Sequence, residues 1–343
     1  MDRRILITGG AGFIGANFVR HLMGRHPRDE LLVLDALTYA GGMDNFSEQI
    51  RQDPRFAFYH GDVRNTALVQ DLVGQVDTVV HFAAETHVAR SIYNDRVFFE
   101  TDVLGTQSVA SAVQKNRQRI ERLIHISTSE VYGTALTKPM NEDHPLNPGS
   151  PYAAAKAGAD RLVYSYWHTY GIPAVILRPF NQFGPHQHLE KVIPRFVTSA
   201  LLDEPLTIHG SGEARRDWLF VEDTCERIEK ALSAPPEKVI GDVFNLGAGE
   251  DRDILSIAHL VLELLQKPRS LIRFIPDRPG QVQHHLSDTS KAAGTLGLSP
   301  GRPFEAALEQ TVRWYKDHEP WWRKRLEMRR VPITTSEGAI EYY

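Results

Sequence analysis

The sequence of 343 residues has a single cysteine, Cys225, and a net charge of only −4. One cysteine excludes an intrachain disulfide and argues against a cysteine-based metal site. Because the chain carries no excess of positive charge, we expect neither nucleic-acid binding nor attraction to an anionic membrane. Its apolar runs stay below the ~18 residues of a membrane-spanning helix. No leader-like apolar segment precedes the first expected strand, so a cytoplasmic location is expected.

A glycine-rich turn near the start is the strongest feature that is present. The apolar run 5–7 indicates a buried strand, and apolar residues of helical period begin soon after it. Between them the chain has GxxGxxG spacing, and the residues expected at a cofactor are Gly9, Gly12, Phe13, Ile14 and Gly15. A strand, a tight turn and a helix N-terminus suit a pyrophosphate, because backbone N–H groups and the helix dipole point at the anion.

An acidic residue lies where a dinucleotide fold needs one. Asp35 follows the apolar run 31–34 and comes twenty residues after Gly15. This spacing is typical of the acid that binds the adenosine ribose. A carboxylate accepts a hydrogen bond from a 2′-hydroxyl and repels a 2′-phosphate, so the sequence predicts NAD rather than NADP.

Strand-like and helix-like segments alternate through the first half of the chain. Strands are expected at 4–8, 31–35, 56–60, 77–82, 122–127 and 173–178, and helices near 12–25, 65–74, 95–117 and 151–170. Repeated βα units with nearly continuous apolar strands predict a parallel sheet that is covered on both faces. We therefore predict an α/β fold with a doubly wound, Rossmann-type sheet.

The second half has a different composition, with prolines and glycines spread through 179–212 and 276–303. We expect an NAD-binding domain over 1–180 and a smaller α/β substrate domain over most of 181–330. The segment 221–246, with a helix and a short strand, should pack back on the large sheet, and another helix is expected near 253–266. The polar tail 331–343 is either loose or folded over a site.

A tyrosine and a lysine share one face of the helix expected at 151–170. Tyr152 and Lys156 are four residues apart, so they lie one turn from each other. A phenol is a poor base at neutral pH, but a neighbouring ammonium and an oxidised nicotinamide would both lower its pKa. The pair predicts a tyrosinate that removes a hydroxyl proton while the cofactor takes the hydride.

Polar residues also follow the strand expected at 122–127. Thr128, Ser129 and Glu130 come directly after it. The carboxyl ends of strands line the ligand crevice in an open α/β sheet, so these side chains should face the same site as Tyr152.

Together these residues resemble the extended short-chain dehydrogenases/reductases. Within them the chain is most similar to the nucleotide-sugar dehydratases and epimerases, and closest to the dTDP-glucose 4,6-dehydratases. The resemblance spans about the whole chain. Its further motifs are Leu37–Gly41, Ala83–Ser91, Asn181–Pro194, Arg216–Asp223 and Asp277–Gly280.

The resemblance implies a role for each matching position. Besides the glycine turn and Asp35, the cofactor would contact Asp62, Val63, Ala83, Ala84, Tyr152 and Lys156. The nucleotide sugar would contact His87, Thr128, Asn181, Lys191, Arg216, Asn245 and Arg278. The catalytic set would be Thr128, Ser129, Glu130, Tyr152 and Lys156. The basic residues among these suit a diphosphate.

The implied reaction is a closed redox cycle. Tyr152 takes the proton of the sugar O4 and hydride passes from C4 to NAD⁺. Glu130 then removes the acidified C5 proton, water leaves from C6, and hydride returns to C6. The product is a 4-keto-6-deoxy sugar.

Ser129 is a departure from the most similar dehydratases, which carry aspartate there as the acid for the C6 hydroxyl. The Thr-Ser-Glu sequence also occurs in GDP-mannose 4,6-dehydratases and in UDP-glucuronate decarboxylases. Dehydration is preferred because 85–87 and 181–194 resemble dehydratase segments. UDP-glucuronate decarboxylation, 4-epimerisation and a non-catalytic NAD-sensing role stay open. Gln281 stands where the dehydratases have a histidine, so the nucleotide base stays open.

Two further expectations concern partners and metals. The helices at 95–117 and 151–170 form the dimer contact in the resembled family, so a homodimer is expected. His186 and His188 are two residues apart, but no acid or cysteine completes a ligand set, so no metal is expected.

Overall fold

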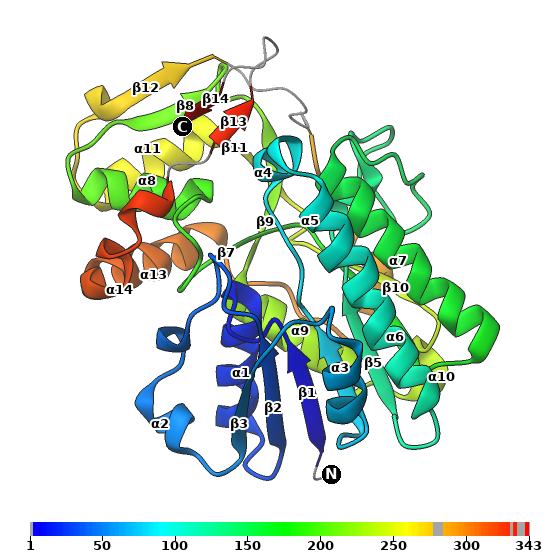
Figure 1. Cartoon of the computed structure of the whole chain (residues 1–343). Helices are drawn as coiled ribbons and strands as arrows, with labels where there is room; N and C mark the ends of the chain where they lie inside the picture. Colours follow the sequence, from blue (N-terminus) through cyan, green and yellow to red (C-terminus); the bar gives the residue numbers. More distant parts are fainter. Residues whose placement is uncertain (1–2, 277–283, 330–331, 335–339, 343) are drawn as a thin grey trace.

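A seven-stranded parallel sheet forms the centre of the molecule in the computed structural model, which describes residues 3–276, 284–329, 332–334 and 340–342 (Figure 1). The strand order is β10-β6-β5-β4-β1-β2-β3, and every neighbouring pair is parallel. The strands are β1 (Arg4–Thr8), β2 (Glu30–Asp35), β3 (Phe56–His60), β4 (Thr78–His81), β5 (Arg122–Ile126), β6 (Ala174–Pro179) and β10 (Val243–Leu246). The predicted α/β fold with a doubly wound sheet is confirmed.

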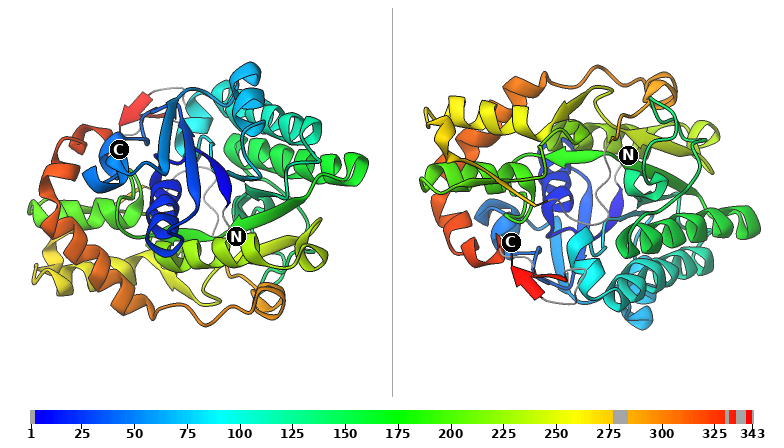
Figure 2. Two further views of the ribbon diagram at one scale, coloured as in Figure 1. Left: turned by 90° about the horizontal axis from the view of Figure 1, so that it is seen from below. Right: turned by 90° about the horizontal axis from the view of Figure 1, so that it is seen from above.

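Helices cover both faces of this sheet (Figure 2). One layer contains α1 (Phe13–Arg25), α9 (Val221–Ser233) and α12 (Ser290–Leu296), and the other contains α3 (Thr66–Val73), α6 (Thr106–Lys115) and α7 (Pro151–Tyr170). In β1, Ile5 and Ile7 pack into the first core and Leu6 into the second, and all three are fully buried. Burial on both faces explains why the strands are nearly continuous apolar runs.

The strand order reverses beside β1. From β1 the chain moves outward to β2 and β3, and it then returns to β4 on the other side of β1. Loops leave in opposite directions at such a point, so a crevice opens at the carboxyl ends of the strands. The glycine turn after β1 lies at this crevice.

The helix expected over 95–117 is interrupted. It consists of α5 (Arg96–Phe98), a π-helical segment η2 (Phe99–Gly105) and α6. A π-helical turn accommodates an extra residue and changes which side chains face inward, and such turns are frequent at functional sites. Here the segment directs Asp102 into the protein, where it is fully buried.

The second half adds a smaller unit with its own core. Its strands form a three-stranded sheet β11-β9-β7 and a parallel pair β12–β8. The elements are β7 (Asn181–Phe183), α8 (Val192–Leu201), β8 (Leu206–His209), β9 (Arg215–Phe220), β11 (Asp251–Asp253), α11 (Ile254–Leu264), β12 (Ile272–Ile275), α13 (Phe304–Asp317) and α14 (Glu319–Arg323). Side chains of α8, α11 and α13 pack together with those of β8 and β9 in one cluster.

Shorter elements connect these units. They are η1 (Met43–Asn45), α2 (Glu48–Gln52), α4 (Val88–Tyr93), η3 (Ser129–Tyr132), α10 (Pro236–Val239), η4 (Arg269–Leu271) and η5 (Leu326–Arg329). At the end of the chain, β13 (Pro332–Thr334) pairs antiparallel with β14 (Ile340–Tyr342). Strand β13 lies against α4 at the top of Figure 1. Within the described ranges, the helices are all too short or too polar to cross a membrane.

Candidate active site

A cavity of about 530 Å³ lies at the carboxyl ends of the central strands. This volume is within the usual range of small-molecule sites, ~300–1,000 Å³. Its wall includes most of the residues singled out in the sequence: Gly9, Gly12, Phe13, Ile14, Gly15, Asp35, Asp62, Val63, Ala83, Ala84, His87, Thr128, Ser129, Glu130, Tyr152, Lys156, Asn181, Lys191 and Arg216. Segments far apart in the sequence therefore meet at one site.

The glycine turn has the close packing that a pyrophosphate cradle requires. Gly9 has φ +68°, and a Cβ there would lie 2.5 Å from the backbone nitrogen of Ala83. A Cβ on Gly15 would overlap the carbonyl oxygen of Gly9. Helix α1 starts at Phe13, and within the described chain its first turn has no side-chain cap and no acidic residue. Its N–H groups are thus available to an anion, and the turn fits a dinucleotide.

Asp35 is held rigidly at the end of β2. Its Oδ2 accepts a hydrogen bond from the Ala11 N–H at 2.9 Å, and its Oδ1 accepts from the Leu37 N–H at 2.8 Å. Burial raises the pKa of Asp35, while these two N–H groups oppose the rise. Each carboxylate oxygen keeps a further lone pair, so Asp35 can still accept from a ribose hydroxyl.

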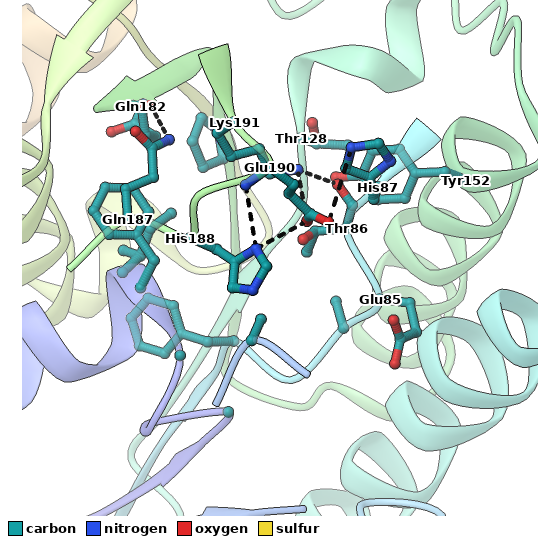
Figure 3. Close-up of a pocket in the computed structure, with 18 of the residues that line it drawn as sticks. Glu85, Thr86, His87, Thr128, Tyr152, Gln182, Gln187, His188, Glu190 and Lys191 are labelled. Atoms are coloured by element: carbon teal, nitrogen blue, oxygen red, sulfur yellow. Dashed lines mark hydrogen bonds and ion pairs between the residues drawn. The ribbon is translucent and has the colours of Figure 1, made fainter. Parts of the chain in front are cut away.

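Tyr152 lies in the first turn of α7, where Ser150 caps the helix by accepting from the Ala153 N–H at 3.2 Å. Its hydroxyl is hydrogen-bonded to the Thr128 side chain, and Figure 3 shows the two residues side by side. Burial raises the pKa of Tyr152, the Thr128 hydrogen bond lowers it, and the charges of Asp102 and Glu130 raise it again. The net direction is upward, so these protein groups favour the phenol.

The expectation that Lys156 and an oxidised nicotinamide together lower this pKa stays a prediction. Lys156 is not among the described groups that shift the pKa of Tyr152. Its Nζ instead donates to the Ile126 carbonyl at 2.7 Å, and its charge interacts with Asp102 and Asp160. As the helical spacing predicted, Lys156 lies one turn after Tyr152 in α7, and both residues line the cavity.

Asp102 is a buried acid behind the cavity wall that the sequence pattern missed, and its charge acts on Tyr152 and Lys156. Its Oδ1 accepts from the Glu85 N–H at 2.7 Å, which fixes the loop after β4. Its Oδ2 is buried and has no hydrogen-bond partner among the described residues. Burial raises the pKa of Asp102, and the Lys156 ammonium opposes that rise. The π-helical turn that places it has no clear sequence signal.

A buried carboxylate organises the other end of the cavity. Glu190 is 1% exposed at its side chain and lies 3.0 Å from Nε of Arg90. It is also 4.0 Å from Nε2 of His87 and 3.8 Å from Nδ1 of His188. Nζ of Lys191 lies 3.8 Å away, so Glu190 is surrounded by basic groups, as Figure 3 shows.

The basic side chains of the cavity come from several elements. Lys191 precedes α8, and Arg195 lies one turn later on the same helix face and also lines the cavity. The K-x-x-x-R spacing in the sequence could have indicated Arg195 as a further basic residue of the site. Arg216 lies on β9, opposite the strand ends. Such cations suit a nucleoside diphosphate.

One expected substrate contact, Asn245, lies outside the described cavity wall. Among the described residues, the cavity wall does not include Asn245, which is fully buried. Its amide accepts from the Tyr132 hydroxyl at 2.7 Å and donates to the Met140 carbonyl at 3.0 Å, because β10 is the outermost strand beside β6. Arg278 and Gln281 lie outside the described residues.

The described residues also contain no group of three or more His, Cys, Asp or Glu side chains placed to hold a metal ion. The histidines considered for a metal are used otherwise. His186 packs in a tilted arrangement against Trp314 with ring centres 4.3 Å apart, and His188 contacts Tyr39 edge-on.

Known proteins match this sequence over most of the chain. The family model for GDP-mannose 4,6 dehydratase matches residues 6–311. A dTDP-glucose 4,6-dehydratase of Actinoplanes sp. is 41% identical over 324 residues, which cover 93% of this chain and 99% of that protein. The low-salt glycan biosynthesis protein Agl12 of Haloferax volcanii is 43% identical over 311 residues, covering 91% and 98%.

A solved structure agrees in three dimensions. The crystal structure of DesIV, a dTDP-glucose 4,6-dehydratase from Streptomyces venezuelae with NAD bound, superposes with a TM-score of 0.89. It is 40% identical and covers 94% of this chain and 99% of its own. On its sequence, its sheet and its cavity, this chain belongs to the GDP-mannose 4,6-dehydratase family of extended short-chain dehydrogenases/reductases.

Proposed function

We propose that this protein is an NAD-dependent nucleotide-sugar 4,6-dehydratase, which converts a nucleoside-diphosphate hexose to its 4-keto-6-deoxy form. The observation that carries the proposal is that Tyr152 and Glu130 face the same cavity as the glycine turn and Asp35. A hydroxyl-deprotonating group and a second base thus share one chamber with the dinucleotide cradle. The relatives named above, dehydratases among them, support this reading.

Each described residue has a distinct task in this reaction. When bound, NAD⁺ would supply a reversible hydride acceptor. Tyr152, aligned by Thr128, removes the proton of the C4 hydroxyl. Oxidation at C4 makes the C5 proton acidic, and Glu130, in η3 after β5, removes it.

The nucleotide part of the substrate occupies the end of the cavity that Lys191, Arg195 and Arg216 line. Their positive charges offset the charge of the diphosphate. Asn181, at the start of β7, and His87 also line the cavity. Thymidine diphosphate glucose is the first substrate to test, since two of the relatives are named for it.

The substitution Glu130→Gln tests the proposal. With NAD⁺ and dTDP-glucose, we expect C4 oxidation to continue while deuterium uptake at C5 and water loss fall by about 10²–10⁴-fold. The control is Glu121→Gln, an exposed residue just before the amino end of the same strand. Full C5 exchange in Glu130→Gln would show that Glu130 is not the base at C5. If the wild type releases carbon dioxide from UDP-glucuronate and no water from any hexose nucleotide, the reaction is decarboxylation instead of dehydration.

We also propose that the protein is a homodimer through α7 and the α5–η2–α6 segment. Large apolar side chains are exposed on these elements, including Leu104 at 57%, Phe99 at 41% and Tyr164 at 38%. Exposed apolar groups that gather on one face favour a protein contact. Leu104→Glu should yield a monomer by light scattering, whereas a wild-type monomer would contradict the proposal. The cytoplasmic location stays a prediction.

A further inference from the structure

Loss of water from a sugar requires an acid as well as a base. Hydroxide is a poor leaving group, so the departing C6 oxygen must receive a proton as the C6–O bond breaks. In the proposed function Glu130 is occupied as the base at C5. Ser129, its neighbour in the cavity wall, is the adjacent candidate, but an isolated hydroxyl is a very weak acid.

A buried histidine stands directly behind this serine. Nδ1 of His285 lies 3.4 Å from Oγ of Ser129, and Nε2 of His285 lies 2.8 Å from the carbonyl oxygen of Gly133. A carbonyl only accepts hydrogen bonds, so Nε2 carries a hydrogen in either charge state. Nδ1 is consequently the nitrogen that can exchange a proton with Ser129.

The backbone fixes His285 at this place. Its N–H donates to the Arg215 carbonyl at 3.2 Å, and the next carbonyl, of Leu286, accepts from the Met140 N–H at 2.8 Å. The ring packs edge-on against Phe180 with centres 5.9 Å apart. His285 is 0% exposed and Ser129 is 2% exposed. Because Ser129 lines the cavity, a ligand in the cavity would contact the pair through Ser129.

Charged groups face the imidazole from three sides. Burial lowers the pKa of His285, Glu130 on η3 raises it, and Arg216 on β9 lowers it. The Gly133 carbonyl raises the pKa and His144, from the loop after η3, lowers it, with a net direction downward. A lowered pKa makes the imidazolium a stronger acid, although a smaller fraction is charged at neutral pH.

We propose that Ser129 and His285 form a proton relay that protonates the departing C6 hydroxyl group, with Ser129 in contact with the sugar and His285 acting through it. This inference rests on the proposed dehydratase function. It assigns the acid of the elimination to a pair that is assembled from two distant parts of the chain.

The step balances in atoms and electrons. Glu130 takes the C5 proton, and the electron pair of that C–H bond becomes the C5–C6 double bond as the C6–O bond breaks. Ser129 gives its hydroxyl proton to the departing oxygen while Nδ1 of the His285 imidazolium gives a proton to Ser129. Water leaves and His285 becomes neutral. His285 then regains a proton from solvent, and Tyr152 releases to solvent the proton that it took from the C4 hydroxyl group. Glu130 returns its proton to C5 when hydride reaches C6.

The test uses the NAD⁺-loaded protein with dTDP-glucose and measures C4 oxidation, C5 deuterium exchange and water loss separately. In His285→Gln and Ser129→Ala we expect oxidation and exchange to continue while water loss slows by about 10²-fold or more. His284→Gln is the matched control, because this adjacent histidine is 29% exposed at its side chain and pairs with Asp251 at 3.2 Å. It should behave like the wild type.

Two readouts separate a relay from a structural role. A substrate with fluorine in place of the C6 hydroxyl needs less help from an acid, so both variants should release fluoride at nearly the wild-type rate. In the wild type, water loss should decline as pH rises through the histidine pKa, and His285→Gln should lack this dependence. Ser129→Asp in the His285→Gln background should restore water loss by supplying an acid directly.

Water loss from His285→Gln within about twofold of the wild type would overturn the relay. Fluoride release slowed as much as water loss would also overturn it, since the damage would then not concern the acid. If the wild type releases no water from any hexose nucleotide, the proposed function fails instead. If His285→Gln does not fold, Ser129→Ala decides by the same two readouts.

Discussion

At the cofactor end of the cavity the backbone forms the binding surface, whereas at the sugar end charged side chains form it. Gly9 and Gly15 sit where any Cβ would meet neighbouring backbone. At the other end, Glu190 is buried among Arg90, His87, His188 and Lys191. The first surface is built from one short stretch of sequence, and the second needs segments from several parts of the chain.

The difference shows which changes each end can tolerate. A backbone cradle is rigid and independent of pH, and it is damaged by added volume. A cluster of buried charges depends on each partner, because removal of one leaves another uncompensated. Tyr152 lines the cavity at the junction where the cofactor and the sugar would meet, and the charge of Asp102 acts on its pKa.

The largest expected effect is at this junction. Tyr152→Phe removes the group that takes the C4 proton, so we expect turnover to fall by about 10²–10⁴-fold while NAD⁺ affinity stays unchanged. The appearance of reduced nicotinamide after mixing with dTDP-glucose measures this step. Tyr164→Phe, on the same helix but 38% exposed, is the control. An unchanged oxidation rate in Tyr152→Phe would exclude Tyr152 as the base.

The next prediction tests the cofactor end by adding side-chain volume to the glycine turn. In Gly15→Ala the new Cβ overlaps the Gly9 carbonyl oxygen, and relief of that overlap should weaken NAD⁺ binding by about 10-fold to 100-fold, or ~1–3 kcal/mol. Gly24→Ala, in the same helix, is the control, since a Cβ there meets nothing within 4 Å. Titration calorimetry measures both. Equal affinities would mean that the turn does not hold the pyrophosphate.

A smaller effect is expected at the sugar end. Burial alone would raise the pKa of Glu190, but the charges of Lys191, His87, His188 and Arg90 outweigh it, and the pKa is lowered. The carboxylate therefore contributes stability above its ordinary pKa, and this contribution is lost as pH falls through the lowered value. Glu190→Gln should lose that acid sensitivity in thermal unfolding.

The same substitution should raise the KM for the nucleotide sugar by about 10-fold, because the basic groups around position 190 lose their partner. NAD⁺ affinity should not change, which separates the two ends of the cavity. Glu204→Gln is the control, because the Glu204 side chain is 45% exposed and pairs with Arg329. A change in NAD⁺ affinity instead of KM would show that the ends are not independent.

The smallest effect is a shift in pH dependence. Asp102 raises the pKa of Tyr152, so Asp102→Asn should lower it. The oxidation rate rises with pH as Tyr152 ionises, so this rise should move to lower pH in Asp102→Asn. Asparagine can still accept from the Glu85 N–H, which preserves the loop. Exposed Asp95→Asn is the control, and an unmoved profile in Asp102→Asn would mean that its charge does not reach Tyr152.

The sequence by itself determined the sheet and the cofactor end. The strands are buried on both faces and read as apolar runs, and α7 spans Pro151–Tyr170 as its pattern predicted. The glycine turn and Asp35 are local in sequence, and local spacing dictates where backbone N–H groups point. Thr128, Ser129 and Glu130 were also predictable, because the carboxyl end of a strand fixes their side of the sheet.

Only the tertiary structure decided the side chains that act across the cavity. The segment η2 buries Asp102, and the Lys156 ammonium donates to the Ile126 carbonyl. His285 reaches Ser129 from 156 residues away in sequence. Such contacts arise from how distant segments pack, and single-chain periodicity carries no information about which buried charge will face which partner.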